Sequence, residues 1–239
     1  MNRFAALYRK EMLELFATPL AYAIVAVFWF ASGYFFSFSL FFVQAAEMVG
    51  SFHNLTLLLL LVAPILTMRV FAEEAASGTL ELLLSLPLGE ARIVLAKYAA
   101  LLSLLVLLLL GSAVAVVPLA LYAQPDPGPI LGGYLGLFLF GAAIFALGSL
   151  VSSLTTSQAV AAVCTWGLLL LLWFVDYGGH LFRDPQGLFV ARLLHHLSLS
   201  LHTRSMIRGS LDGASVVYLI SLVFGALVWA TQALRWRRT

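Results

Sequence analysis

Acidic side chains are concentrated in one stretch of the sequence, RVFAEEAASGTLELLLSLPLGEARIVLAKY, at positions 69–98. The stretch holds four of the eleven acidic residues of a chain that is 62% hydrophobic and 10% charged. Carboxylates beside apolar membrane segments form ion pairs within the chain or contact a second protein. For Glu73 and Glu74 both interpretations stay open, and the intrachain partners to consider are Arg69, Arg9 and Lys10.

Five leucines fall within seven residues of the same stretch: Leu80, Leu82, Leu83, Leu84 and Leu86. A connector surrounded by water would expose these apolar side chains unfavourably. A short helix with an apolar face instead buries that face. We therefore predict that another protein covers it. Pro87 is expected to separate two short helical pieces, and Gly78 is a candidate helix break.

The sequence lacks the motif that would hold a nucleotide. A P-loop needs Gly-x-x-x-x-Gly-Lys-Ser/Thr, because its backbone amides and its lysine bind the phosphates. The chain has two lysines, Lys10 before Glu11 and Lys97 before Tyr98, and neither fits this pattern. We expect no enzyme activity and no cofactor in this chain.

Histidines and serines indicate no catalytic or metal site either. His195, His196 and His202 are close in sequence, but no His-Glu-x-x-His motif or carboxylate cluster accompanies them. We interpret these histidines as structural or interfacial. There is no Gly-x-Ser-x-Gly elbow and no pair of intramembrane aspartates. The expected sets of catalytic and metal-binding residues are therefore empty.

Composition places the chain in a membrane. Soluble domains carry about 25% charged residues, and this chain cannot supply such a polar surface. A helix needs about 20 apolar residues to cross a hydrocarbon core of about 30 Å. That rule predicts one all-α domain over residues 1–239 with six spans: Leu20–Val43, Phe52–Phe71, Ile93–Tyr122, Ile130–Val151, Ser157–Val175 and Ser215–Leu234.

Positive residues predict the orientation of the spans. With six spans both termini lie on one side, which then holds nine of the thirteen Lys and Arg residues. The first two loops on the other side have no Lys or Arg. Both termini are therefore expected in the cytoplasm, with the chain in the cell (inner) membrane.

Three segments lie outside the predicted spans. Residues 1–18 are expected to form an amphipathic elbow helix on the cytoplasmic leaflet, with its apolar face made of Phe4, Leu7, Tyr8, Met12, Leu15 and Phe16. Residues 72–92 form the cytoplasmic connection between spans two and three. Residues 176–213 form an external segment with a second amphipathic or re-entrant helix, whose stripes are Val190, Leu193, Leu194, Leu197 and Leu201 against Arg192, His195, Ser198 and His202.

Glycines recur in the fourth span, where Gly132 and Gly136 are followed by Gly141 and Gly148. Small residues let two helices approach closely. Packing within the chain is the favoured interpretation, and an interface between subunits is the alternative.

The run FAEEAASGTLELLLSLPLGEARIVLAKY resembles the segment after the second span of ABC-2-type transporter permeases, the membrane subunits of type V ABC exporters. The resemblance covers most of the chain. It includes the elbow helix, the six spans, the Glu-x-x-x-x-Gly-Thr-x-Glu connector and the helical segment before the last span. It is nearest to the short permeases associated with gliding motility.

This resemblance implies a permease subunit that pairs with a second copy or a related permease. It also implies a cytosolic ATP-binding subunit, carrying ATP and Mg²⁺, that docks on the connector, or coupling helix, and on the elbow. The residues implied for docking are Glu73, Glu74, Gly78, Thr79, Glu81, Leu82, Pro87, Arg9 and Lys10. Spans one and five would line the dimer seam and a pathway, near Phe28, Ser32, Gly33, Phe36, Thr156 and Gln158.

Two other functions stay open. One is a membrane anchor or scaffold that docks a cytosolic ATPase without transport, and the other is a secondary carrier or channel. Ion-coupled carriers usually need Asp, Glu or His within their spans, and the spans here have almost none. This scarcity favours a conduit that is powered from outside the membrane and moves a lipidic, amphiphilic or polymeric substrate. No nucleic acid partner is expected.

Overall fold

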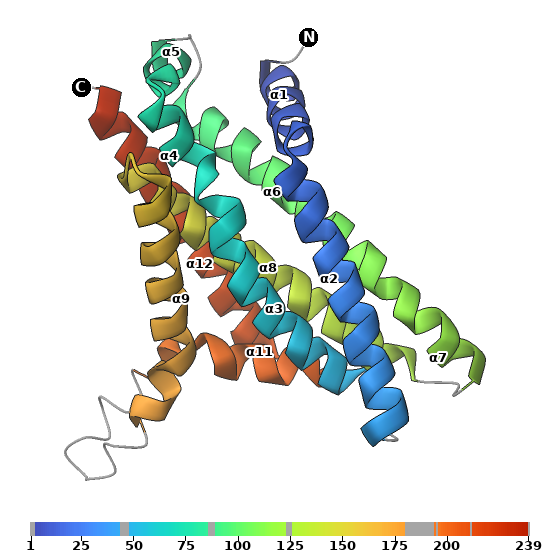
Figure 1. Cartoon of the computed structure of the whole chain (residues 1–239). Helices are drawn as coiled ribbons and strands as arrows, with labels where there is room; N and C mark the ends of the chain where they lie inside the picture. The colour runs from blue at the N-terminus through green and yellow to red at the C-terminus, as the bar shows by residue number, and fades with distance from the viewer. Residues whose placement is uncertain are drawn as a thin grey trace, which may run out of the picture.

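The structure, a computed structural model, describes residues 3–43, 48–85, 89–122, 126–179, 194, 196–210 and 212–238 (Figure 1). All regular secondary structure in these residues is helical. Six stretches are long and apolar enough to cross a membrane: Pro19–Phe41, Val49–Ala76, Glu90–Leu121, Pro127–Leu154, Gln158–Val175 and Gly213–Arg237. The predicted all-α architecture with six spans is confirmed.

The helical elements in chain order are α1 (Arg3–Ala17), α2 (Pro19–Phe38), η1 (Ser39–Val43), α3 (Val49–Thr67), α4 (Arg69–Ala76), α5 (Thr79–Ser85), α6 (Glu90–Ser112), η2 (Ala113–Ala115), α7 (Val116–Tyr122), α8 (Pro127–Leu154), α9 (Gln158–Gly179), α11 (Leu199–Ile207) and α12 (Gly213–Arg238). The second span consists of α3 and α4, so it extends past the predicted end at residue 71 and carries Glu73 and Glu74 on a helix.

Local sequence explains where two of the spans begin. Pro19 occupies the first position of α2, where the missing amide hydrogen is not needed for a helical hydrogen bond. Asp126 precedes α8, and its carboxylate accepts a hydrogen bond from the amide of Gly128 at 3.0 Å. The first and fourth spans therefore start at residues that suit a helix N-terminus.

The helix α8 lies in the middle of the bundle and contacts α3, α4, α6, α9, α11 and α12. Its glycines are placed at these contacts. A side chain at Gly132 would meet the backbone of Gly209, and one at Gly148 would meet Thr67. Similar contacts with Met206 and Leu105 explain Gly136 and Gly141. The favoured interpretation of these glycines, close packing within the chain, agrees with the structure.

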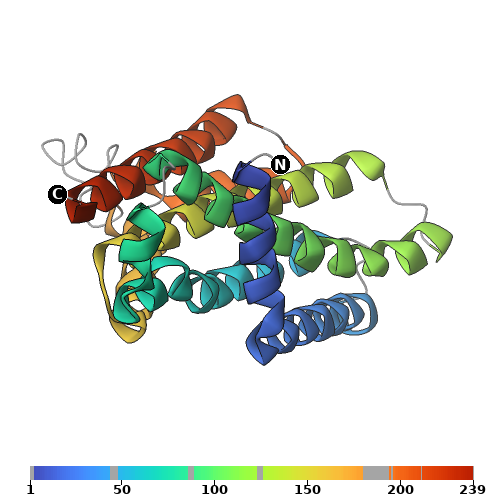
Figure 2. The same ribbon diagram turned by 90° about the horizontal axis from the view of Figure 1, so that it is seen from above.

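Both termini lie at the same end of the bundle, together with α1 and α5 (Figure 1). Viewed onto this end, α1 crosses over α6, which it contacts (Figure 2). We call this the terminal end. The helix α11 and the first turn of α12 lie at the opposite end. The arrangement is the one expected for an even number of spans.

The single amphipathic helix predicted across residues 190–202 is wrong, because the described chain breaks at Ser198. The Ser198 hydroxyl accepts a hydrogen bond from the amide of Leu201 at 3.4 Å and caps α11. The hydrophobic spacing alone predicts a continuous helix through Ser198. A new helix starts there instead, because the Ser198 cap satisfies an amide at the helix start. Ser198 is buried, whereas Leu197 is 42% exposed, which reverses their predicted faces. The predicted stripe residues Val190, Arg192, Leu193 and His195 lie outside the described residues.

Candidate functional site: a buried ion-pair network beside an exposed turn

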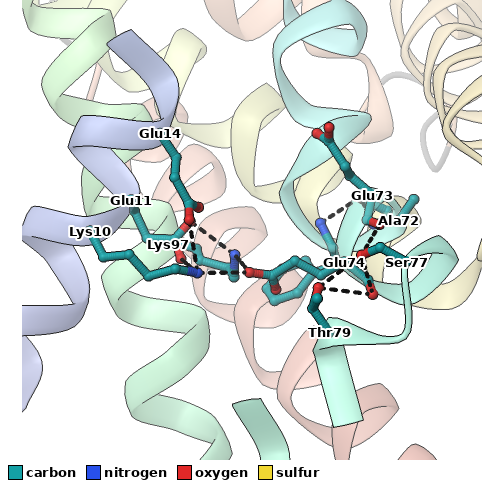
Figure 3. Close-up of polar contacts among 11 residues, drawn as sticks. Lys10, Glu11, Glu14, Ala72, Glu73, Glu74, Ser77, Thr79 and Lys97 are labelled. Carbon is teal, nitrogen blue, oxygen red and sulfur yellow. Dashed lines mark hydrogen bonds and ion pairs between the residues drawn. The ribbon is translucent and has the colours of Figure 1, made fainter. Parts of the chain in front are cut away.

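A buried ion-pair network joins three helices at the terminal end (Figure 3). Lys97 of α6 has its Nζ 2.9 Å from Glu11 Oε2 of α1 and 3.0 Å from Glu74 Oε1 of α4. The Lys97 side chain is only 2% exposed. A charge buried this deeply is tolerated where opposite charges replace the lost water. The network therefore ties α1, α4 and α6 together although they are distant in sequence.

Lys10 of α1 extends the network toward solvent. Its Nζ lies 3.2 Å from Glu74 Oε1, 3.2 Å from Glu14 Oε1 and 3.5 Å from Glu11 Oε1. Partial burial acts to lower the pKa of Lys10, but attraction to Glu11 and Glu74 outweighs it, so this pKa is raised. The resulting stabilisation is fully present below the ordinary lysine pKa of about 10.4 and is lost only in stronger alkali.

The carboxylates of Glu11, Glu14 and Glu74 could in principle share a metal ion, since their oxygens lie within 4.8 Å of one another. The ammonium groups of Lys10 and Lys97 already contact these carboxylates at 2.9–3.5 Å. Each ammonium supplies the positive charge that a metal would bring. The donor set therefore fits an ion-pair network better than a metal centre.

The ion pairs border a cleft of about 580 Å³. Its polar lining includes Lys10 and Glu14 of α1 and Glu73 of α4, and its apolar lining includes Leu66 and Leu101. Lys10 and Glu74 bridge α1 and α4 beside this open space. The helices α1 and α4 are thus joined by charged side chains, and the cleft lies beside these ion pairs.

Ser152 of α8 sets the direction of α4. The chain breaks at Met68 between α3 and α4, and the Ser152 Oγ accepts hydrogen bonds from the amides of Phe71 and Ala72, both at 3.1 Å. The same hydroxyl donates to the Met68 carbonyl at 3.1 Å. One buried side chain therefore satisfies three backbone groups at the break, and this fixes the path that brings Glu74 to Lys97.

The helix α4 ends in an exposed turn, residues 76–79, which we call the connector turn. Gly78 has φ 73°, a left-handed conformation that residues with a Cβ rarely adopt. The Ser77 Oγ lies 2.8 Å from the Thr79 Oγ1 and 3.0 Å from the Glu73 carbonyl oxygen. Gly78 is therefore the break between α4 and α5, as its sequence position suggested.

The prediction that another protein must bury the connector leucines is wrong for three of them. Leu80, Leu83 and Leu84 are buried in an apolar cluster of this chain, together with Leu7, Phe71, Ile93, Val94, Ala96, Ala230 and Leu234. Leu82 points away and is 69% exposed. The sequence pattern identified an apolar face correctly. It could not distinguish a neighbouring helix of the same chain from a second protein.

The structure pairs Glu73 and Glu74 within the chain. Glu73 accepts two hydrogen bonds from Arg69, Nε to Oε2 and Nη2 to Oε1, both at 2.8 Å. Glu74 is held by Lys10 and Lys97. Of the other residues predicted for docking, Arg9, Gly78, Thr79, Glu81 and Leu82 are exposed, whereas Pro87 lies outside the described residues.

Residues 36–179 match a family model described as ABC-2 family transporter protein. The match spans more than half of the 239 residues and includes the connector turn, Lys97 and Ser152. The chain belongs to the ABC-2 transporter family. No curated protein matches it.

The residues predicted for a seam or pathway of this ABC-2 transporter occupy different environments. Phe28, Ser32 and Phe36 are buried on α2, a helix that packs on α3 and α6. Gly33 and Thr156 are exposed, and Gln158 is half-buried. The first three thus belong to the core of the single chain, and a role for all six in a pathway stays a prediction.

Three residues that organise this end of the transporter were not predicted as site residues: Glu11, Lys97 and Ser152. Lys97 gave a usable signal, because a lone ammonium in the apolar run RIVLAKYAALL requires a carboxylate partner. Ser152 gave none. Its neighbours Ser149 and Ser153 look the same in sequence, yet each donates only to a carbonyl of its own helix.

Proposed function

We propose that this ABC-2 transporter is the permease subunit of an ATP-driven exporter and that a separate ATP-binding subunit docks on its terminal end. The docking face consists of the exposed residues Ala76, Ser77, Thr79, Glu81 and Leu82. The observation that carries this proposal is the direct connection between the docking face and the network. Thr79 Oγ1 donates to the carbonyl of Glu74 at 3.4 Å, and Glu74 binds Lys97.

Movement of the docking face is transmitted to the spans through Glu74. Its Oε1 is shared by Lys97 on α6 and Lys10 on α1, so displacement of α4 pulls on both helices. Separating one partner from a buried ion pair costs about 3–5 kcal/mol. The three helices therefore move together, and the cleft beside α1 and α4 gives them room to do so.

The terminal end is assigned to the cytoplasm, where an ATP-binding subunit would be found. Both termini lie at this end, and so do α1 and the beginning of α6 (Figure 1). These segments, together with α4, the connector and the end of α12, carry nine of the thirteen Lys and Arg residues. An excess of positive residues on the cytoplasmic side supports this orientation.

ATP and Mg²⁺ are assigned to the partner, and no enzyme activity is assigned to this chain. Phosphate binding by a P-loop needs a lysine that is free to reach the nucleotide. Lys10 and Lys97, the two lysines of the sequence, are both held by carboxylates. This engagement supports hydrolysis on a separate subunit.

A second permease, either a copy of this chain or a related one, is proposed to complete the pathway. Large apolar side chains are exposed along α2 and α9, among them Tyr22, Phe30, Tyr34, Val163 and Phe174. Lipid covers much of such a surface in a membrane. The remaining part is available for a neighbouring permease, so the pathway would form between two chains.

Substitutions at Leu82 test the docking proposal. The transporter is co-expressed with an ATP-binding-cassette subunit that copurifies with the unaltered chain, and recovery of that subunit is measured together with ATP-dependent efflux. Leu82→Asp is expected to lower both at least about tenfold, because it places a charge in an apolar contact. Leu82→Met, the matched control, is expected to retain both. Glu73 and Glu74 are left unchanged, since their ion pairs would confound the result.

The outcomes distinguish the alternatives. Full recovery of the ATP-binding subunit with Leu82→Asp and with the double variant Glu81→Lys/Leu82→Asp contradicts docking on this face. Recovery without efflux of any lipid or amphiphile tested favours a scaffold. Efflux that continues without ATP favours a carrier.

A further inference from the structure

The cleft beside the ion-pair network has the dimensions and the lining of a ligand site. Its volume of about 580 Å³ falls within the range of about 300–1,000 Å³ that is usual for small-molecule pockets. Charged and apolar side chains from α1, from the second span and from α6 line it together. A molecule that fills the cleft must therefore match both kinds of lining.

The two kinds of lining are arranged along the bundle. The helices α1 and α6 run from the terminal end into the bundle, and α4 runs toward that end (Figure 1). Each of the three contributes a charged residue to the cleft and, four residues deeper in the bundle, an apolar one, so both lie on the same helix face. These pairs are Glu11 and Leu15 on α1, Glu74 and Val70 on α4, and Lys97 and Leu101 on α6. The cleft thus suits an amphiphile with its head at the terminal end and its apolar tail directed into the bundle.

The charged lining leaves one negative charge unbalanced. Four carboxylates and three cations line the cleft, which gives it a net charge of −1 when all are ionised. Arg69 and Glu73 pair with each other, so the excess belongs to the carboxylates around the two lysines. These carboxylates are Glu11, Glu14 and Glu74, and the lysines are Lys10 and Lys97 (Figure 3). A cationic head balances this charge, whereas an anionic head increases the repulsion.

The network is also short of hydrogen-bond donors. Within the described residues, Glu11 Oε1 and Glu74 Oε2 are buried and accept no hydrogen bond. Glu11 is only 8% exposed, and Lys10 Nζ at 3.5 Å is an ion-pair partner of its Oε1 that lies beyond ordinary hydrogen-bond distance. A primary ammonium supplies three donors. The carboxylates already hold the ammonium groups of Lys10 and Lys97, so a further group of the same chemistry fits this site.

We propose that the cleft binds an amphiphile with one positive charge, carried by a protonated primary amine at the head of an alkyl chain. The ammonium binds at Glu14, whose side chain is 56% exposed and therefore open to an entering ligand, beside the buried carboxylates of the network. The alkyl chain follows the apolar lining at Leu15, Val70 and Leu101. The site belongs to the single chain, so it does not depend on docking of an ATP-binding subunit.

Thermal unfolding of the purified full-length chain in phosphatidylcholine nanodiscs tests the site, with dodecylamine as the probe. The amine is protonated at pH 7, as a lysine side chain is. The rise of the unfolding midpoint with amine concentration gives the Kd. Dodecanol has the same chain without the charge, and methylamine has the head without the chain. Each is expected to bind at least about tenfold more weakly, because each lacks one of the two recognised features.

Lysophosphatidylethanolamine distinguishes a free amine from a lipid headgroup. It carries the same ammonium group on an apolar chain, but its phosphate makes the net charge zero. Because the cleft lacks one positive charge, this lipid is expected to bind at least about tenfold more weakly than dodecylamine.

The variant Glu14→Gln removes the unbalanced charge and keeps the shape of the side chain. It is expected to weaken dodecylamine binding at least about tenfold, because a charged acceptor becomes neutral. The matched control is Glu81→Gln, which changes an exposed carboxylate of the terminal end outside the cleft lining and is expected to leave the Kd unchanged. No ATP-binding subunit is present, so failure here leaves the docking proposal untouched.

Several outcomes contradict the proposed site. Equal affinity for dodecylamine and dodecanol, or for dodecylamine and methylamine, overturns it and requires no variant to fold. Lysophosphatidylethanolamine binding as tightly as dodecylamine overturns the requirement for a net positive charge. Dodecylamine binding that Glu14→Gln leaves unchanged, or that Glu81→Gln weakens equally, overturns the placement of the ammonium in the cleft.

Discussion

The two ends of the bundle are held together by different kinds of interaction. At the terminal end, full charges are buried: Lys97 lies between Glu11 and Glu74, which come from two other helices. At the opposite end, backbones approach closely at Gly132 and Gly209, and hydroxyl groups such as those of Ser200 and Thr203 are buried. Charged contacts can exchange partners, whereas close backbone contacts depend on shape. The terminal end is therefore held by contacts that can change partners, and the opposite end by contacts that fix its packing.

Removing Lys97 should lower the free energy of unfolding more than any other change proposed here, because the terminal end depends on its buried ion pairs. Lys97→Met leaves Glu11 and Glu74 buried with only Lys10 to neutralise them, and we expect a loss of about 3–5 kcal/mol. Thermal unfolding in detergent should show a strongly lowered midpoint. The triple variant Glu11→Gln/Glu74→Gln/Lys97→Met should recover much of the loss. If the unfolding midpoint of the triple variant is no higher than that of Lys97→Met, unpaired buried charge is not the cause of the lost stability.

Two glycines with the same backbone conformation sharpen the comparison between the ends. Gly209 has φ 81° and Gly78 has φ 73°, but a Cβ at Gly209 would meet the backbone of Pro129, whereas one at Gly78 meets open space. Gly78→Ala should lose about 1–2 kcal/mol from backbone strain alone. Gly209→Ala should lose more, because overpacking adds about 1–3 kcal/mol. Equal shifts in the unfolding midpoint would show that the packing at the opposite end is looser than the structure indicates.

Ser152 allows a test of how α4 is positioned. Ser152→Ala removes the acceptor for the amides of Phe71 and Ala72 and should cost about 1–3 kcal/mol. Ser149→Ala is the matched control, since that hydroxyl donates only to Phe145 of its own helix, and its effect should stay within about 0.5 kcal/mol. Proteolysis of the connector turn should also accelerate in Ser152→Ala alone. Equal losses of stability and equal proteolysis rates in the two variants would show that Ser152 does not position α4.

Arg69 should give the smallest effect. Its ion pair with Glu73 is partly exposed and lies within one helix, four residues apart. Arg69→Gln should therefore change stability by about 0.5 kcal/mol or less. A shift in the unfolding midpoint that approaches that of Lys97→Met would mean that the ion-pair network extends to this pair. The buried pairs of Lys97 would then contribute no more to stability than an exposed pair does.

The sequence predicted the six spans and the apolar face of the first helix because both depend on periodicity and length. It placed Glu73 and Glu74 in a connector that begins at residue 72, whereas the structure carries both on the helix of the second span, and it did not predict their contacts. Leu80, Leu83 and Leu84 pack on Leu234 and other residues far away in sequence, and no local pattern shows which helix arrives there. Ser152 and Lys97 contribute through long-range contacts of the same kind. At Ser198, a single capping side chain interrupted a helix that hydrophobic periodicity alone would have continued.

The state of the two lysines has a practical consequence for labelling. Amine-reactive dyes and cross-linkers require an accessible, unprotonated lysine, and Lys97 is inaccessible while Lys10 is held protonated by its carboxylates. The single cysteine of the sequence, Cys164 on α9, is exposed. Because Cys164 lies within the span Gln158–Val175, its exposed thiol is at membrane depth, so labelling the native sequence at this one position calls for a maleimide probe that enters the lipid.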